Sequence, residues 1–267
     1  MSATTTVPAA SLAAMGAAAA FCTLLPIGVL VWWRRRERAQ LRPALWGAFT
    51  FLLFSQGLEA GLHYFCLLSD NAVSRVILSS PWLYMLYGAL AAGIFEECGR
   101  FVMYKTVMRG YDRRSAAVTA GIGHGGAEAM LLSGASLAFS LVFAVYWNAG
   151  DTDALMQLTG SLDAVQTVAA SMGKYTVGYC LLACVERVSA MLLQISLSVF
   201  VFVAARNRTK LSWLPFAVGL HAVFDMPCAL YQLGYIDELL PVELWLAVCA
   251  LYALRSARKC YLEECDP

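Results

Sequence analysis

Charged residues are scarce in this chain, and their scarcity excludes most soluble folds. Only 14% of the 267 residues are Asp, Glu, Lys or Arg and 60% are hydrophobic, whereas about a quarter of a soluble domain is charged. The formal net charge is only +1, so a nucleic-acid partner has no support. The nine cysteines include no CxxC pair, so neither a disulfide framework nor a zinc-finger spacing is visible.

The long apolar stretches that remain predict a polytopic membrane protein. Stretches of roughly twenty apolar residues recur along the chain, the length that a helix needs to cross a bilayer. Because the bilayer core holds no water, the backbone must satisfy its own hydrogen bonds as helices. We therefore expect an all-α bundle in a single integral membrane domain, residues 1–267, surrounded by membrane lipids. The seven expected spans are approximately 9–33, 43–68, 81–107, 115–149, 174–204, 211–233 and 241–254.

The basic residues between the expected spans indicate an orientation. Those that follow the odd-numbered spans fall on one side of the membrane, and the loops of the opposite side hold only Arg75 and Lys174. By the positive-inside rule, the N-terminus is then outside and the C-terminus is cytoplasmic. The basic residues of the cytoplasmic side are Arg34, Arg35, Arg36, Arg38, Arg42, Lys105, Arg109, Arg113, Arg114, Arg206, Arg208, Lys210, Arg255, Arg258 and Lys259.

Once the charged residues near the span ends are assigned to the loops, eleven Asp, Glu, His and Arg residues remain inside the expected spans. Each one costs at least ~2.5 kcal/mol at the centre of a membrane helix. Residues retained against that cost suggest a functional site, although an ion pair that only locks helices together is a competing interpretation. The residues are Glu59, His63, Glu96, Glu97, Arg100, His124, Glu128, Glu186, Arg187, His221 and Asp225.

Several of these groups are expected at one depth. Glu97 lies twelve residues before Arg109, His124 ten after Arg114, and His221 eleven after Lys210. At ~1.5 Å per residue these separations are roughly 15–18 Å, about half of a ~30 Å hydrocarbon core. Gln194, twelve residues before Arg206, is expected at the same level. The third to sixth spans therefore bring polar groups to one plane near the middle of the membrane.

The local spacings indicate metal or water chemistry in that plane. His124 with Glu128, and His221 with Asp225, are i,i+4 pairs, a spacing that lets two side chains on a helix reach one metal ion. Zinc accepts imidazole and carboxylate ligands, and a further Glu could act as general base on a bound water.

The other buried polar residues are expected to support the site. Arg100 is the expected counter-ion of Glu96 or Glu97, at i,i+4 and i,i+3. Glu186 and Arg187 lie nearer the outer face, where a buried pairing role is expected. Glu59 and His63 are candidates for an access path or for support of the site.

Four motifs resemble a known family. "EECGR", "GIGHGGAE", "CVER" and "HAVFDMP", in this order on successive spans, resemble the YhfC family of intramembrane metalloproteases. That family is related to the PrsW proteases and, more distantly, to the type II CAAX prenyl endopeptidases. The resemblance implies peptide-bond hydrolysis inside a membrane, here the bacterial plasma membrane.

The resemblance also implies roles for individual residues. Glu96 and Glu97 would supply the general base, while His124 and His221, with Asp225 and Glu128 beside them, would bind a metal or water. The motifs leave open whether a metal is bound or whether a Glu/His-activated water attacks while His221 and its partner stabilise an oxyanion. Gln194 stands where a histidine is expected in this family.

The leading hypothesis is therefore a metal-dependent endopeptidase, with zinc as the expected ion, that cleaves a membrane-embedded or lipidated peptide. A transporter or proton relay is the first alternative, since midplane carboxylates and histidines also mark ion pathways. Against it, no two halves with matching interrupted helices are visible. A non-catalytic scaffold that retains the polar core for packing is the second alternative, and Gln194 is the feature that favours it.

Overall fold

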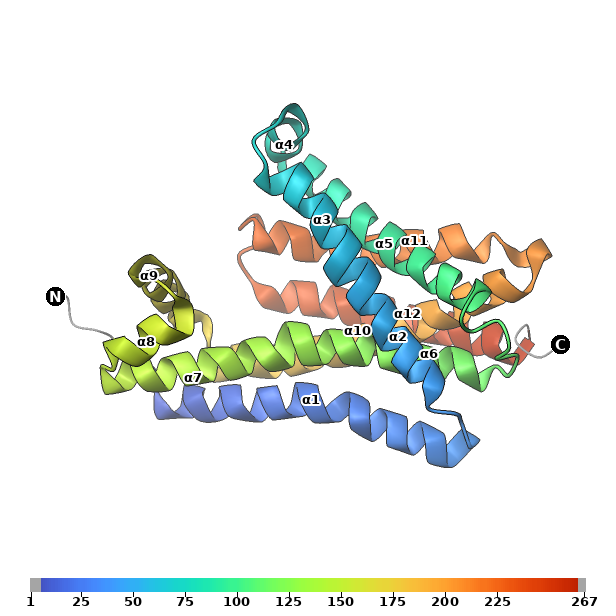
Figure 1. The fold of residues 1–267 in the computed structure, drawn as a ribbon, viewed down its shortest axis with the longest axis horizontal. Coiled ribbons are helices and arrows are strands. Elements are labelled where there is room, and N and C mark those ends of the chain that lie inside the picture. The colour runs from blue at the N-terminus through green and yellow to red at the C-terminus, as the bar shows by residue number, and fades with distance from the viewer. Residues whose placement is uncertain (1–5, 264–267) are drawn as a thin grey trace. The chain divides into compact units, whose positions relative to one another are not determined.

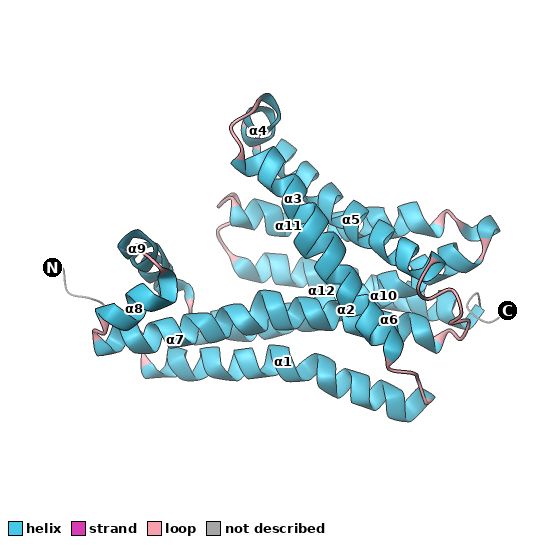
Figure 2. Cartoon of the chain, in the orientation of Figure 1, coloured by secondary structure: helices cyan, strands magenta, loops and turns pink. Residues whose placement is uncertain are grey.

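The computed structural model describes residues 6–263, and this part of the chain is helical throughout. Helices account for 86% of the structure and the described residues contain no strand, which confirms the all-α prediction (Figure 2). Two π-helical segments interrupt or follow α-helical turns in the first half of the chain. The elements of this half, as far as Glu128, are α1 (Ala9–Glu37), α2 (Arg42–Thr50), η1 (Phe51–Glu59), α3 (Ala60–His63), η2 (Tyr64–Leu68), α4 (Ala72–Leu78), α5 (Pro81–Lys105) and α6 (Ser115–Glu128).

The second half begins with a further π-helical segment. It continues α6 directly, so residues 115–149 form one helical stretch whose middle is wound more loosely than an α-helix. The elements are η3 (Ala129–Ala135), α7 (Ser136–Ala149), α8 (Thr152–Thr159), α9 (Leu162–Ser171), η4 (Met172–Lys174), α10 (Val177–Arg206), η5 (Arg208–Lys210), α11 (Trp213–Gln232) and α12 (Leu239–Glu263), as labelled in Figure 1.

Six of these helical stretches are long and apolar enough to cross a membrane, and a seventh span is possible. The seventh is α4 with α5, a pair that passes the same test together but bends by 111° at the break between them. Helix α5 carries Glu96, Glu97 and Arg100, which lower its hydropathy. The prediction of about seven spans therefore agrees with the six or seven helices of suitable length and composition.

The chain divides into two compact units. The first contains Met1–Leu25 and Ala129–Arg187, and the second contains Pro26–Glu128 and Val188–Pro267. Buried Met15, Cys22, Phe143 and Ala144 form the centre of the core of the first unit. In the second unit, the core gathers around the buried aromatic and aliphatic side chains of α10.

Glycines set the helix spacing in the second unit. Helices α5 and α11 pack against each other, and a methyl group on Gly93 would lie 2.7 Å from the carbonyl oxygen of Val218 (Figure 1). Helices α2 and α6 meet in the same way, because a methyl group on Gly47 or Gly123 would overlap the facing backbone. Side chains at these positions would push the helices apart.

Replacement of Gly93 by valine is therefore expected to destabilise the fold, whereas the same change at Gly88 is not. Both glycines lie on α5, but nothing lies within 4 Å of a methyl group on Gly88. Overpacking costs about 1–3 kcal/mol, and backbone atoms yield less readily than side chains. Thermal unfolding of the two variants in one detergent measures the difference, and equal shifts of the midpoint would contradict this account of the packing.

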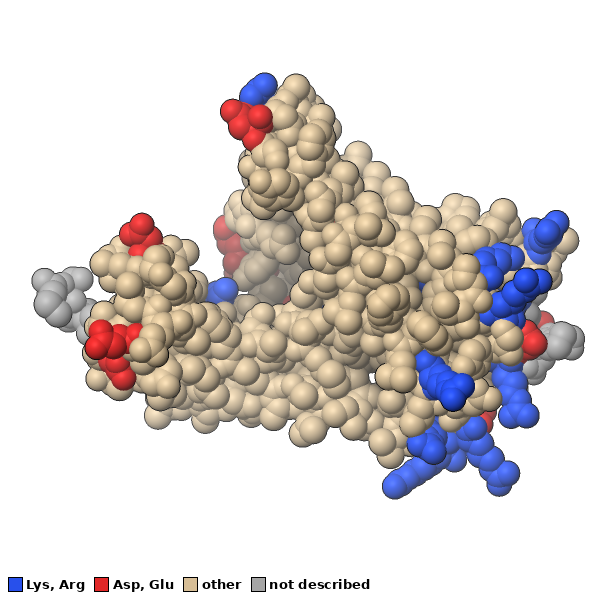
Figure 3. Space-filling view, in the orientation of Figure 1, with Lys and Arg blue, Asp and Glu red and all other residues tan. Residues whose placement is uncertain are grey.

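The basic segments of the second unit gather at one end of that unit (Figure 3). The Arg206 guanidinium donates hydrogen bonds to the carbonyl oxygens of Met108 at 2.6 Å and Tyr111 at 2.9 Å, just after α5. The indole of Trp33 donates to the carbonyl oxygen of Ser115 at 3.4 Å, so the end of α1 meets the start of α6. This clustering is what the positive-inside rule requires, and the orientation itself stays a prediction.

Candidate active site

Two carboxylates and an imidazole converge between α5 and α11. The ligand atoms of Glu96, Glu97 and His221 lie within 4.8 Å of one another, and all three side chains are buried. Nδ1 of His221 is 2.8 Å from Oε1 of Glu97, and its Nε2 is 3.9 Å from Oε2 of Glu96. The glycine contact at Gly93 brings the two helices close enough for these short side chains to meet.

Arg100 provides the positive charge that two buried carboxylates require. Its Nη1 donates to both oxygens of Glu97, at 2.6 and 2.7 Å, and its Nη2 lies 3.4 Å from Oε2 of Glu96. Only 1% of Arg100 is exposed to solvent. A buried charge is tolerated only when it is paired and hydrogen-bonded, so Arg100 and Glu97 depend on each other.

His124 reaches the same site from α6. Its Nε2 lies 2.8 Å from Oε2 of Glu96, and the ring of Phe51 contacts its imidazole edge-on with centroids 5.3 Å apart. Its Nδ1 is buried and makes no hydrogen bond within the described part of the chain. An unpaired buried nitrogen is uncommon, so His124 has one ligand or proton site still available.

Gln194 joins α10 to this cluster. Its amide Nε2 donates to Oε2 of Glu96 at 3.2 Å and to Oε2 of Glu128 at 2.6 Å, and its Oε1 accepts a hydrogen bond from Arg100. An amide can donate and accept at once, which a single imidazole nitrogen cannot do. The predicted i,i+4 partners His124 and Glu128 therefore make different contacts, His124 with Glu96 and Glu128 with Gln194.

Asp225 lies at the more open side of the cluster. Its Oδ2 is 3.4 Å from Nε2 of His221, and 30% of its side chain is exposed. The side chains of Glu96, Glu97, Arg100 and His221 are at most 7% exposed. Among the described residues of the cluster, Asp225 is thus a point where the buried network meets the surroundings.

The donor set at the centre fits a divalent metal. Carboxylate oxygens and an imidazole nitrogen are the ligands of catalytic zinc, and bonds of about 2.0–2.2 Å place neighbouring ligand atoms roughly 3.3 Å apart. Nε2 of His221 lies 3.4 Å from Oδ2 of Asp225 and 3.9 Å from Oε2 of Glu96, which is close to that spacing. The convergent trio shares only His221 with the set expected from the sequence, which was His124, Glu128, His221 and Asp225.

The remaining candidate residues lie in two other groups. In the second unit, Nε2 of His63 is 3.3 Å from Glu59, and its Nδ1 is 2.8 Å from the hydroxyl of Tyr87. In the first unit, Arg187 and Glu186 form an ion pair with each other.

Two residues that contact the candidate histidines, Phe51 and Tyr87, could not be identified from the sequence. Phe51 packs on His124, but it lies between Thr50 and Leu52 in a mostly apolar stretch, so no motif marks it. Tyr87 lies ten residues before Glu97 on the same helix and contacts His63 from another element. Tyrosine in a membrane helix commonly lies at the membrane–water interface, so only the tertiary contact with His63 identifies Tyr87 as part of this group.

The chain is similar to known membrane proteins. Residues 21–246 match the model of the family described as "YhfC intramembrane metalloprotease". The chain is also 37% identical over 238 residues to the "Uncharacterized membrane protein YhfC" of Bacillus subtilis (strain 168), which covers 89% of this chain and 90% of that relative. No solved structure matches the chain. The family match contains every residue of the cluster, and the chain belongs to the YhfC intramembrane metalloprotease family.

Proposed function

We propose that this protein is an endopeptidase that hydrolyses a peptide bond within the membrane. The observation that carries the proposal is the convergence of Glu96, Glu97 and His221 in a buried cluster on helices that are apolar over most of their length. Carboxylates and an imidazole at this spacing can activate water and move protons. The family description names the same class of reaction.

Glu96 is the residue we assign to take the proton from water. Both oxygens of Glu97 accept hydrogen bonds from Arg100, so neither is free to take a proton from water. Glu96 uses Oε2 for its contacts with His124, Gln194 and Arg100. Its Oε1 makes no hydrogen bond to another described residue, so it is left to accept a proton and later to pass it to the leaving amine.

The other side chains position the reactants. Arg100 fixes Glu97, and Glu97 in turn orients the ring of His221 through Nδ1. Nε2 of His221, with Asp225 beside it, then faces the place where a peptide carbonyl would develop negative charge. A divalent metal, with zinc as the proposed ion, would be held by Nε2 of His221, Oε2 of Glu96 and an oxygen of Glu97. It would supply Lewis acidity to that carbonyl in place of a direct contact with Nε2, and Oε1 of Glu96 would remain to accept the proton.

The proposed substrate is a membrane-embedded or lipidated peptide. The cluster lies on helices that are long enough to cross a membrane, so a peptide that reaches it must be compatible with an apolar environment. The partial exposure of Asp225 is the feature that favours entry from its side. In this proposal the N-terminus is outside, and the protein lies in the bacterial plasma membrane.

Purified protein in lipid nanodiscs tests the proposal with a library of membrane peptides. We expect cleavage by the wild type, none by His221→Ala, and normal cleavage by Glu243→Gln. Glu243 is a matched control because it is also a buried carboxylate on a candidate span, but it lies on α12. A chelator should abolish cleavage and added zinc should restore it.

Elemental analysis and flux measurements complete this test. Zinc is expected in the wild type and not in His221→Ala. Absence of cleavage of every peptide, together with no bound metal, would reject the peptidase. Substrate-dependent ion flux in proteoliposomes would show a transporter instead.

A further inference from the structure

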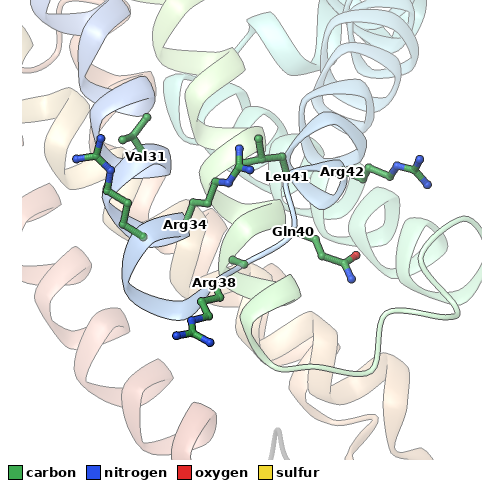
Figure 4. A pocket seen from close by; sticks show the side chains of 8 residues that line it. Val31, Arg34, Arg38, Gln40, Leu41 and Arg42 are labelled. Atoms are coloured by element: carbon green, nitrogen blue, oxygen red, sulfur yellow. The ribbon is translucent and has the colours of Figure 1, made fainter.

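The turn between α1 and α2, in the second unit, borders a hollow that shares no residue with the buried cluster. Its volume is about 1020 Å³, and four of the residues that line it are arginines, Arg34, Arg35, Arg38 and Arg42. Figure 4 shows the side chains of Arg34, Arg38 and Arg42 arranged around this turn. Four arginines that line one hollow favour an anionic occupant.

These charges are not neutralised within the described part of the protein. None of the four arginines has a carboxylate within ion-pair distance there. Among residues 6–263, no acidic residue lines the hollow, and Glu37, the acidic residue within the same stretch of sequence, pairs with Arg36 at 3.8 Å. The hollow therefore offers guanidinium donors that still lack an acceptor.

Arg38 holds an unusual backbone conformation at the centre of the turn. Its φ is +48°, and it is the one residue other than glycine with positive φ among those described. Glycine would adopt this conformation without strain, so the arginine is retained against a conformational preference. Arg38 also lines a neighbouring hollow of about 240 Å³, together with Arg113, which lies just before α6.

Apolar side chains in the same hollow indicate what kind of anion fits. Val31 and Leu41 line it and are 44% and 37% exposed. Trp32 is 54% exposed, and the Arg36 guanidinium lies 5.4 Å from the centre of its ring, a pairing typical of a membrane interface. Because α1 and α2 are parts of two candidate spans, the turn that joins them lies at a membrane surface.

We propose that this hollow binds the headgroup of an anionic phospholipid. The phosphate would accept forked hydrogen bonds from the arginines, and the acyl chains would lie along Val31 and Leu41. A free phosphate ion could use the arginines but not the apolar lining. The proposal does not depend on the peptidase, because it concerns charges and surfaces outside the buried cluster.

Native mass spectrometry of the purified protein tests this with three probes: phosphatidylglycerol, phosphatidylcholine and inorganic phosphate. The wild type should retain phosphatidylglycerol in preference to both other probes. Each arginine near a membrane surface contributes about fivefold in affinity. The triple variant Arg34→Gln, Arg38→Gln, Arg42→Gln should therefore bind phosphatidylglycerol roughly 100-fold more weakly.

A matched control removes the same charge elsewhere on the second unit. Arg255→Gln, Arg258→Gln, Lys259→Gln changes three exposed basic residues of α12 and should leave phosphatidylglycerol binding within about threefold of the wild type. An equal loss in the control would show general charge attraction and overturn the site. Equal retention of phosphatidylcholine, or of inorganic phosphate, would overturn the anionic lipid as its occupant.

Arg38→Gly separates lipid binding from folding. Glycine relieves the left-handed backbone, so the unfolding midpoint should stay the same or rise. Affinity for phosphatidylglycerol should nevertheless fall about fivefold, because one guanidinium is lost. Unchanged affinity in this well-folded variant would contradict the proposal.

Discussion

Replacement of Arg100 by leucine is expected to lower the free energy of unfolding by about 3–5 kcal/mol. Leucine fills much of the same space but leaves the carboxylate of Glu97 buried without its counter-ion. Glu97 is fully buried, and both of its oxygens bind the Arg100 guanidinium. Chemical unfolding in mixed micelles measures the loss.

The ion pair between Arg75 and Asp70 supplies the control. Its N–O distance is also 2.6 Å, but its side chains are 66% and 88% exposed. Exposed pairs contribute at most about 1 kcal/mol, so Arg75→Leu should have little effect. The two ion pairs have equal N–O distances, but they are expected to contribute differently to the free energy of unfolding because only the Arg100–Glu97 pair is removed from water.

A double variant tests the cause of the expected loss. Arg100→Leu with Glu97→Gln removes both charges, so most of the stability lost in the single variant should return. Failure of the second substitution to restore stability would show that Arg100 acts through packing or through Gln194, and not through the charge of Glu97.

Replacement of Glu96 by glutamine is expected to lower kcat by about 10²–10⁴-fold with any peptide that the wild type cleaves. Glutamine is isosteric and its amide oxygen can still accept from His124, Gln194 or Arg100. It cannot take a proton from water. Because the substitution is isosteric, KM and the unfolding midpoint should change little. Steady-state cleavage measures kcat and KM, and thermal unfolding measures the midpoint.

Glu97→Gln is expected to behave differently from Glu96→Gln. It weakens the pair with Arg100 and the contact with His221, so stability should fall together with activity. The assignment would be contradicted if Glu96→Gln kept full activity while Glu97→Gln lost kcat without any loss of stability. That result would assign the base to Glu97 and leave Glu96 as the residue that orients His124.

The sequence predicted much of the polar cluster because depth in a helix follows from residue count. Glu97, His124, Gln194 and His221 are each ten to twelve residues from a basic cluster. In the structure Glu96 contacts His124, Gln194 and His221, and His221 also contacts Glu97. The rise per residue is fixed, so counting along each helix was sufficient.

Which residues of the cluster contact one another could not be predicted by counting residues along each helix. The i,i+4 spacing suggested His124 with Glu128, yet His124 contacts Glu96 on α5 and Glu128 contacts Gln194 on α10. Spacing says which residues share a face of one helix, but not which other helix that face meets. Gln194 suggested a lost ligand in the sequence, and the structure gives it three hydrogen-bond partners in the cluster.

The sequence by itself determined the class of this protein, an all-helical membrane protein, and it predicted that ionisable groups on several helices lie at a common depth. It could do so because the bilayer imposes a length, a hydropathy and a cost for each charge. Only the tertiary structure decided that Glu96, Glu97 and His221 converge, with Arg100 against Glu97. That choice depends on how each helix is rotated about its axis, which close contacts such as Gly93 with Val218 fix after the helices have formed.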